Sequence, residues 1–107
     1  MKVEQFIHAN QFHLYGNGKD ILQSYDSKVV EIEYLNGKQV VTLGRDWDYS
    51  TTTSKHVYAF LEEYSKIRIS DTNKRQYINR LIEEYKNDKK AFVDKYNFII
   101  LYTEEMH

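Results

Sequence analysis

The sequence predicts an α+β fold, in which a small antiparallel sheet from the N-terminal half is covered on one face by two to three helices. The sheet is indicated by two Asn-Gly pairs, Asn17-Gly18 and Asn36-Gly37, each flanked by segments with the alternation typical of strands. The helices are indicated by apolar residues that recur at helical spacing in the C-terminal half. At 107 residues, the chain has the length of a single domain.

Two hairpins are expected in the sheet. Residues 11–15 and 19–25 form the first, and residues 29–35 and 38–43 form the second, each around a two-residue Asn-Gly turn. In the second hairpin the short loop fixes the register, and therefore the side chains that share a face. Its apolar face is formed by Ile32 opposite Val41 and Val30 opposite Leu43, and its polar face by Glu31, Glu33, Thr42 and Lys38.

Two long helices and a shorter third are expected next. The first begins in the hydroxyl-rich run Ser50–Ser54, because Ser and Thr side chains cap helix N-termini. The second begins near Ser70-Asp71 and is interrupted at Asn87-Asp88, after which the third follows. The apolar stripes are Val57, Phe60, Leu61 and Tyr64; Tyr77, Ile78, Leu81, Ile82 and Tyr85; and Ala91, Phe92 and Tyr96.

Two segments leave alternatives open. Residues 2–9 form either a short helix, in which Val3, Phe6 and Ile7 share one face, or an irregular segment. Residues 98–102 form either a last buried strand or the apolar end of the third helix. Their β-branched and aromatic side chains favour the strand.

Composition indicates a cytoplasmic protein that does not enter membranes. Cysteine is absent, which favours a reducing compartment and excludes disulfides and thiolate chemistry. The first residues do not have the pattern of a signal peptide, and the longest apolar run, residues 98–102, is too short to span a bilayer. The net charge of −1 argues against a protein that coats nucleic acid.

Two short elements carry a resemblance to known proteins. One is Ser24-Tyr25 followed by Ser27, and the other is Tyr49-Ser50, Thr52-Thr53 and Lys55-His56. These elements resemble a group of small proteins of bacteriophages and prophages of Gram-positive bacteria. In that group, a Ser-Tyr-x-Ser/Thr element leads a valine-rich hairpin and a Tyr-Ser-x-Thr-Thr-x-Lys/Arg-His element leads a helix. The resemblance covers about a third of the chain, and it implies a phage or mobile-element setting and no particular enzymatic activity.

The connection between the second hairpin and the first helix is the best candidate for binding a partner. It holds Trp, Tyr and Arg, which are enriched at the energetic centres of protein interfaces. The candidate partner-binding residues are Arg45, Asp46, Trp47, Asp48, Tyr49, Lys55 and His56. Two alternatives are open: Trp47 packs at the end of the sheet core instead, or Asp46 and Asp48 share a hard cation. Because further acidic ligands cannot be placed, we expect no metal.

The run Ser50–Ser54 also has two interpretations. Free N–H groups at the helix start, with Lys55 and His56, are suited to hold a phosphate. Alternatively, the hydroxyls cap the helix and tie the preceding turn to the sheet. Capping accounts for the Ser and Thr residues and leaves Lys55 and His56 unexplained.

A second candidate site is a basic face on the C-terminal half. Residues 66–95 hold nine Lys and Arg residues and five Asp and Glu residues. Lys66, Arg68, Lys74, Arg75 and Arg80 are candidates for contacts to a nucleic-acid backbone. The alternative is a solvated helix face, because Glu83 and Glu84 offset part of this charge.

No sequence motif of nucleophilic, zinc-dependent or nucleotide-dependent catalysis occurs in the chain. We therefore expect a protein without a cofactor that is not an enzyme and that binds a host protein, with nucleic acid as the alternative partner. A small sheet covered on one face has an exposed edge, so pairing with a second copy of the chain is a further expectation.

Overall fold

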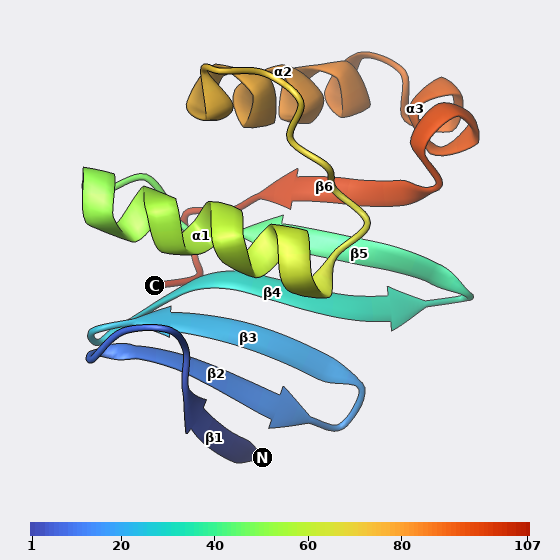
Figure 1. Ribbon diagram of the computed structural model, residues 1–107. Coiled ribbons are helices and arrows are strands. Elements are labelled where there is room, and N and C mark those ends of the chain that lie inside the picture. Colours follow the sequence, from blue (N-terminus) through green and yellow to red (C-terminus); the bar gives the residue numbers. More distant parts are fainter.

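The computed structural model describes all residues, 1–107, and contains one six-stranded sheet and three helices. The strands lie in the order of the chain, and all three helices pack on one face of the sheet (Figure 1). The α+β prediction is confirmed. The elements are β1 (Lys2–Gln5), β2 (Gln11–Gly16), β3 (Lys19–Ser24), β4 (Ser27–Leu35), β5 (Lys38–Leu43), α1 (Thr51–Tyr64), α2 (Lys74–Asn87), α3 (Lys89–Tyr96) and β6 (Phe98–Tyr102).

Both predicted hairpins are present with the predicted turns. Asn17 and Gly18 have φ values of 53° and 74°, and Asn36 and Gly37 have 53° and 79°, as a type I′ turn requires at its two central positions. The register of the second hairpin is also confirmed. Ile32 pairs with Val41 and Val30 with Leu43, and all four side chains are buried under the helices.

A bulge in β4 adds a residue to the core that alternation does not predict. Leu22 pairs with Val30, whereas Gln23 pairs with Lys28, so Val29 has no partner of its own on β3. An extra residue in one strand bends it locally and breaks the strict alternation of faces. As a result, Val29 and Val30 are both buried in the same hydrophobic core.

The uncovered face of the sheet is less polar than the alternation of the second hairpin predicts. Glu31 and Glu33 do lie there, each within 3.5 Å of the ammonium of Lys19. Their cross-strand partners Ile21 and Val40, however, are buried on this same face, at 4% and 5% exposure. Neighbouring side chains of adjacent strands therefore shield apolar residues that no helix covers.

The helix considered for residues 2–9 is wrong, because Lys2–Gln5 form the edge strand β1, antiparallel to β2. Phe6 then turns into the core, where its ring meets the Phe60 ring edge-on with centroids 5.3 Å apart. Positive φ values at Ile7 and Asn10 reverse the chain before β2. The outer edge of β1 has no strand beside it, so pairing with a second copy stays a prediction.

α1 and α2 each begin after a residue whose side chain, a hydroxyl or an amide, caps the helix N-terminus. Ser50 accepts a hydrogen bond from the backbone N–H of Thr53, as predicted for α1. The predicted start of α2 near Ser70-Asp71 is wrong, because Asn73 is the cap and accepts from the N–H of Gln76. The side chain of Asp71 instead accepts from the N–H of Asn73 and shapes the loop before the helix.

The segment 98–102 is a strand, β6, and the alternative of a helix end is wrong. β6 lies beside β5 and runs parallel to it, whereas all other strand pairs are antiparallel. In Figure 1, α1, α2 and α3 form the connection that carries the chain from β5 across the sheet to β6. Parallel neighbouring strands need such a long crossover, so the last strand joins the sheet only near residue 100.

One hydrophobic core joins the sheet to the helices. It comprises 18 buried residues that extend from Phe6 to Ile100 and include side chains of all three helices. No helix of the structure has both the length and the apolar composition that crossing a membrane requires.

The connection after β5 is held by the last residues of the chain. The backbone N–H of Arg45 donates to the carbonyl of Met106 at 3.0 Å. A Cβ added to Gly44 would lie 2.6 Å from that carbonyl oxygen and 2.7 Å from the carbonyl oxygen of Lys28. Only glycine therefore allows the three backbone segments to approach this closely.

Candidate functional site

Trp47 is part of the core and does not lie on the surface. Its side chain is 2% exposed and packs edge-on against the ring of Tyr58, with centroids 6.4 Å apart. The expectation that Trp47 anchors a partner is therefore wrong, and the alternative of packing at the end of the sheet core is confirmed. This burial fixes the connection between β5 and α1 to the body of the protein.

The residues beside Trp47 face outward with separate partners. Asp46 contacts the guanidinium of Arg45, while Asp48 forms an ion pair with Arg75 of α2 at 2.9 Å. Tyr49 is 82% exposed, more than any other large apolar or aromatic side chain. Nowhere in the structure do three His, Cys, Asp or Glu side chains gather in a way that fits a metal ion.

A pocket of about 190 Å³ opens between this connection, the turn after β3 and the start of α1. The two elements that carry the sequence resemblance lie far apart in the chain, yet residues of both line this pocket. Its walls are formed by Ser24, Tyr25, Ser27, Val29, Asp46, Tyr49 and Thr53. Of the predicted partner-binding residues, the pocket includes Asp46 and Tyr49.

A chain of hydrogen bonds forms the inner wall of the pocket. Gln11 Nε2 donates to Ser24 Oγ at 2.9 Å, and Ser24 Oγ lies 3.3 Å from Thr53 Oγ1. Ser50 Oγ donates to Thr53 Oγ1 at 3.2 Å and accepts from the Thr53 N–H at 3.1 Å. The hydroxyls therefore cap α1 and tie its first turn to β3, which confirms the capping interpretation of the run. Anion binding there stays a prediction.

Asp46 supplies the charged group of the pocket. Arg45 Nε donates to Oδ1 at 3.2 Å and Arg45 Nη2 to Oδ2 at 3.4 Å, and Ser27 Oγ donates to Oδ2 at 2.9 Å. The hydrogen bonds from Arg45 and then Ser27 hold the pKa of Asp46 below its ordinary value of 3.8. Asp46 is therefore ionised at neutral pH, and its charge is balanced by the adjacent guanidinium.

Two tyrosines flank the pocket. Tyr25 is 59% exposed and has a φ of 54°, the left-handed region that a bulky side chain seldom adopts. Its backbone N–H donates to the carbonyl of Asn10 at 2.7 Å, which holds it in that conformation. Residues held in such conformations cluster at functional sites. With Tyr49, Tyr25 gives the pocket an aromatic rim that reaches into solvent.

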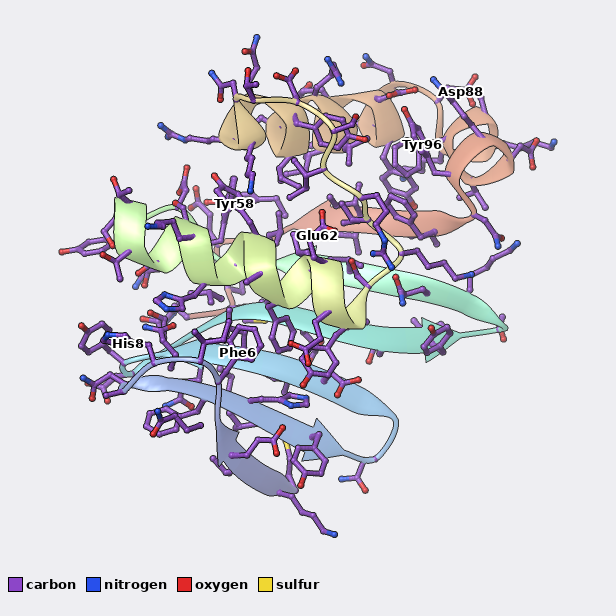
Figure 2. All side chains as sticks on the ribbon, viewed as in Figure 1. Phe6, His8, Tyr58, Glu62, Asp88 and Tyr96 are labelled. Atoms are coloured by element: carbon purple, nitrogen blue, oxygen red, sulfur yellow. The ribbon has the colours of Figure 1, made fainter.

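The predicted basic residues come together only in part. Lys55 and Lys74 line one hollow of about 400 Å³, and Lys55 and Arg75 line a second of about 390 Å³ at the start of α1. Figure 2 shows Tyr58 and Glu62, which line the first hollow, on the side of α1 that faces α2.

The remaining predicted cations line neither of these hollows. Arg68 folds back to donate to the carbonyls of Ser65 and Ile67, and Arg80 lies over the ring of Tyr77 at 5.0 Å. Lys66 lies in the loop after α1. Nucleic-acid binding by the basic face of residues 66–95 stays a prediction. His56 uses Nδ1 to contact the carbonyl of Thr52 at 2.8 Å.

A buried histidine on the covered face of the sheet was not a candidate from the sequence. His13 Nδ1 lies 2.9 Å from a carboxylate oxygen of Glu4, and Nε2 lies 2.7 Å from one of Asp20. The ring packs against Tyr64, with centroids 4.3 Å apart. Because each carboxylate approaches a different nitrogen, this group ties β1 and β3 to β2. The sequence did not indicate this group, because Glu4 comes to lie opposite His13 only when β1 pairs with β2.

A model of a family of unknown function, DUF8033, matches residues 1–79. The chain belongs to the DUF8033 family. The match includes every residue that lines the pocket and the whole of α1. It ends within α2, so Arg80 and all of α3 and β6 lie outside the DUF8033 match. No curated protein and no solved structure matches the chain significantly.

Proposed function

We propose that this DUF8033 protein is a non-enzymatic accessory protein of a bacteriophage or mobile element that binds a host protein in the bacterial cytoplasm. The setting is supported by the resemblance of the two short elements to phage and prophage proteins. The binding role is supported by the pocket on which those elements converge.

The single observation that carries the proposal is the exposed pair Tyr25 and Tyr49 beside this pocket. Tyrosine buries a large area at low conformational cost and is enriched at protein interfaces. Exposing two such rings beside a hollow is unfavourable for an isolated surface, and it is favourable when a partner covers them. Trp47 supports the site from below by fixing the connection to the core.

The size of the pocket favours a protein partner over a small metabolite. Small-molecule sites have volumes of roughly 300–1,000 Å³, whereas this pocket measures about 190 Å³. A hollow of that size accepts one side chain of a larger partner. The surrounding tyrosines then supply the area that a stable complex needs.

The test is a quantitative capture experiment with three variants. The tagged protein is used as bait in lysates of Gram-positive bacteria, and captured proteins are quantified by mass spectrometry. Tyr49→Ala and Tyr25→Asn should each weaken capture of the same protein, because a tyrosine at the energetic centre of an interface contributes about 2 kcal/mol or more. Asn is chosen at position 25 because it tolerates the positive φ.

Leu35→Ala is the matched control for this experiment. Leu35 is also exposed, but it lies beside the Asn36-Gly37 turn, at the opposite end of β4 from the pocket. This variant should capture the partner as the unsubstituted protein does. A captured protein whose amount is unchanged by Tyr49→Ala and Tyr25→Asn, or the absence of any specific capture, would refute the proposal.

Nucleic acid is the second candidate partner, favoured by the shared position of Lys55, Lys74 and Arg75 between α1 and α2. Binding to labelled DNA and RNA oligonucleotides should then appear at low salt and weaken steeply as salt is added. Substituting Lys55 and Lys74 by Ala should reduce the slope of log affinity against log salt concentration by about 1 for each phosphate contact that is lost. Lys28→Ala, an exposed lysine on β4, should leave it unchanged. Absence of binding at low salt would remove this candidate.

A further inference from the structure

The strand β1 forms an open edge of the sheet. It is the last strand at the end of the sheet opposite α2 and α3 (Figure 1). All four of its residues are exposed, and the side chain of Val3 is 60% exposed. An edge strand presents a row of unpaired N–H and C=O groups, to which another strand can add.

The hydrogen bonds to β2 determine which backbone groups of β1 are free. The N–H of Phe6, which continues the register of β1, donates to the carbonyl of the first residue of β2 at 2.8 Å. Hydrogen-bonded and non-hydrogen-bonded pairs alternate along antiparallel strands, so Lys2 and Glu4 also turn their backbone groups toward β2. Val3 and Gln5 therefore turn theirs outward, and an added strand must bond to these two residues.

The side chains of β1 carry opposite charges on one face. Glu4 lies on the face covered by the helices, where one carboxylate oxygen lies 2.9 Å from Nδ1 of His13. Lys2 is two residues away and shares this face. The other carboxylate oxygen of Glu4 has no partner, and Lys2 takes part in none of the ion pairs of the structure.

This order of charges is complementary to itself. A two-fold axis pairs two copies of the strand antiparallel, and outward backbone groups must meet outward groups, so the axis passes through a residue. An axis at Lys2 would oppose two lysines, and an axis at Glu4 would oppose two glutamates, which is unfavourable. An axis at Gln5 would need extended backbone at Ile7, whose φ is 63°. An axis at Val3 places Lys2 of each copy opposite Glu4 of the other.

We propose that β1 pairs antiparallel with β1 of a second copy of the chain, in the register centred on Val3. The N–H of each Val3 donates to the carbonyl of the other Val3, and their side chains meet on the uncovered face of the sheet. Each Lys2 lies opposite Glu4 of the second copy in a non-hydrogen-bonded pair, the arrangement in which side chains of antiparallel strands lie closest. The sheet then continues from one copy into the other.

This dimer goes beyond the proposed function and does not depend on it. No residue of β1 lines the pocket, so each dimer presents two pockets. Two sites on one particle raise the apparent affinity for a partner that itself carries two copies of the recognised surface.

The first measurement is sedimentation velocity of the full chain over a range of concentrations. The unsubstituted protein should show an equilibrium between monomer and dimer. Lys2→Glu opposes like charges twice in each dimer, so the dissociation constant of the dimer should rise about tenfold. Lys28→Glu is the matched control, because it makes the same change of charge at an exposed position on the inner strand β4, and it should leave the equilibrium unchanged.

The second measurement determines the register in the unsubstituted protein, so it does not depend on the folding of a variant. Isotope-filtered NMR of a mixture of labelled and unlabelled chains detects contacts between the two copies. The Hα atoms of Lys2 in one copy and Glu4 in the other should give a strong contact, because Cα atoms in a non-hydrogen-bonded pair lie about 4.5 Å apart. A contact between the two Lys2 residues, or between the two Glu4 residues, would overturn the inference.

Two outcomes of the sedimentation experiment also overturn it. One is a chain that stays monomeric at the highest concentration used for NMR. The other is a dimer that Lys2→Glu leaves intact, or that Lys28→Glu weakens as much, since the contact would then lie elsewhere, for example at the β6 edge. Neither outcome affects the proposed function, because capture of a host protein is measured through Tyr25 and Tyr49.

Discussion

At the scale of single residues, Asp46 links the electrostatics of the pocket to stability. Its pKa lies below 3.8 because Arg45 and Ser27 donate hydrogen bonds to the ionised form. A lowered pKa in the folded state contributes stability that is present above the pKa of the unfolded chain and is lost as the pH falls through the folded value. This contribution is therefore fully present at neutral pH and disappears in acid.

Ser27→Ala should raise the pKa of Asp46 toward 3.8, because it removes the second-largest cause of the shift, after the hydrogen bonds from Arg45. The measurement is an NMR titration of the Asp46 carboxylate in both proteins. Thr42→Ala, which removes a hydroxyl on the uncovered face and away from the pocket, is the control and should leave the titration unchanged. An unchanged pKa in Ser27→Ala would show that the 2.9 Å contact contributes nothing.

Trp47 and Tyr49 are two residues apart, yet truncation of Trp47 should change the free energy of unfolding far more than truncation of Tyr49. Trp47→Ala removes a side chain that is 2% exposed, and it should lower the free energy of unfolding by about 3–5 kcal/mol. Tyr49→Ala, at 82% exposure, should change it by no more than about 0.5 kcal/mol. Chemical denaturation of both variants provides the comparison. Equal effects would contradict the burial of Trp47.

At the scale of elements, the start of α2 gives a direct test of helix capping. Asn73→Ala should lower the free energy of unfolding by about 1 kcal/mol, because the N–H of Gln76 loses its acceptor. Ser70→Ala is the matched control, since Ser70 is exposed and lies before the helix, and it should have almost no effect. A larger effect at Ser70 than at Asn73 would place the helix start where the sequence alone suggests it.

The elements that could be predicted from the sequence are those determined locally. The Asn-Gly turns fix the register of their hairpins, and the stripe from Val57 to Tyr64 specifies α1. β1 was missed because it has no alternation of its own. All four of its residues are exposed, and only its pairing with β2 makes it a strand.

The pocket was predictable only in part, for a similar reason. The sequence pointed to residues 45–49 and to the start of α1, which are neighbours along the chain. Tyr25 and Ser27 join them through the packing of the β3–β4 turn, which no local pattern encodes. The burial of Trp47 likewise depends on Tyr58 and the core behind it, so composition left two interpretations open.

At the scale of the whole molecule, the limits of the family match do not coincide with the limits of the fold. Residues 1–79 include Ile78 but exclude Leu81, Ile82, Phe92, Phe98 and Ile100 of the core. A fragment of residues 1–79 should therefore fail to fold, whereas the full chain should unfold in one cooperative step. Circular dichroism and the dispersion of the amide NMR signals measure this difference. A folded fragment would show that the matched region has an independent core.

The hydrogen bond between Arg45 and Met106 has a consequence during translation. A ribosome that has synthesised only the first half of the chain has already produced every residue that lines the pocket. Yet the hydrogen bond that Met106 adds to the contacts of Trp47 and Ser27 in this segment forms only after residue 106 has emerged from the exit tunnel. The backbone on this side of the pocket is therefore complete only after synthesis has passed that residue.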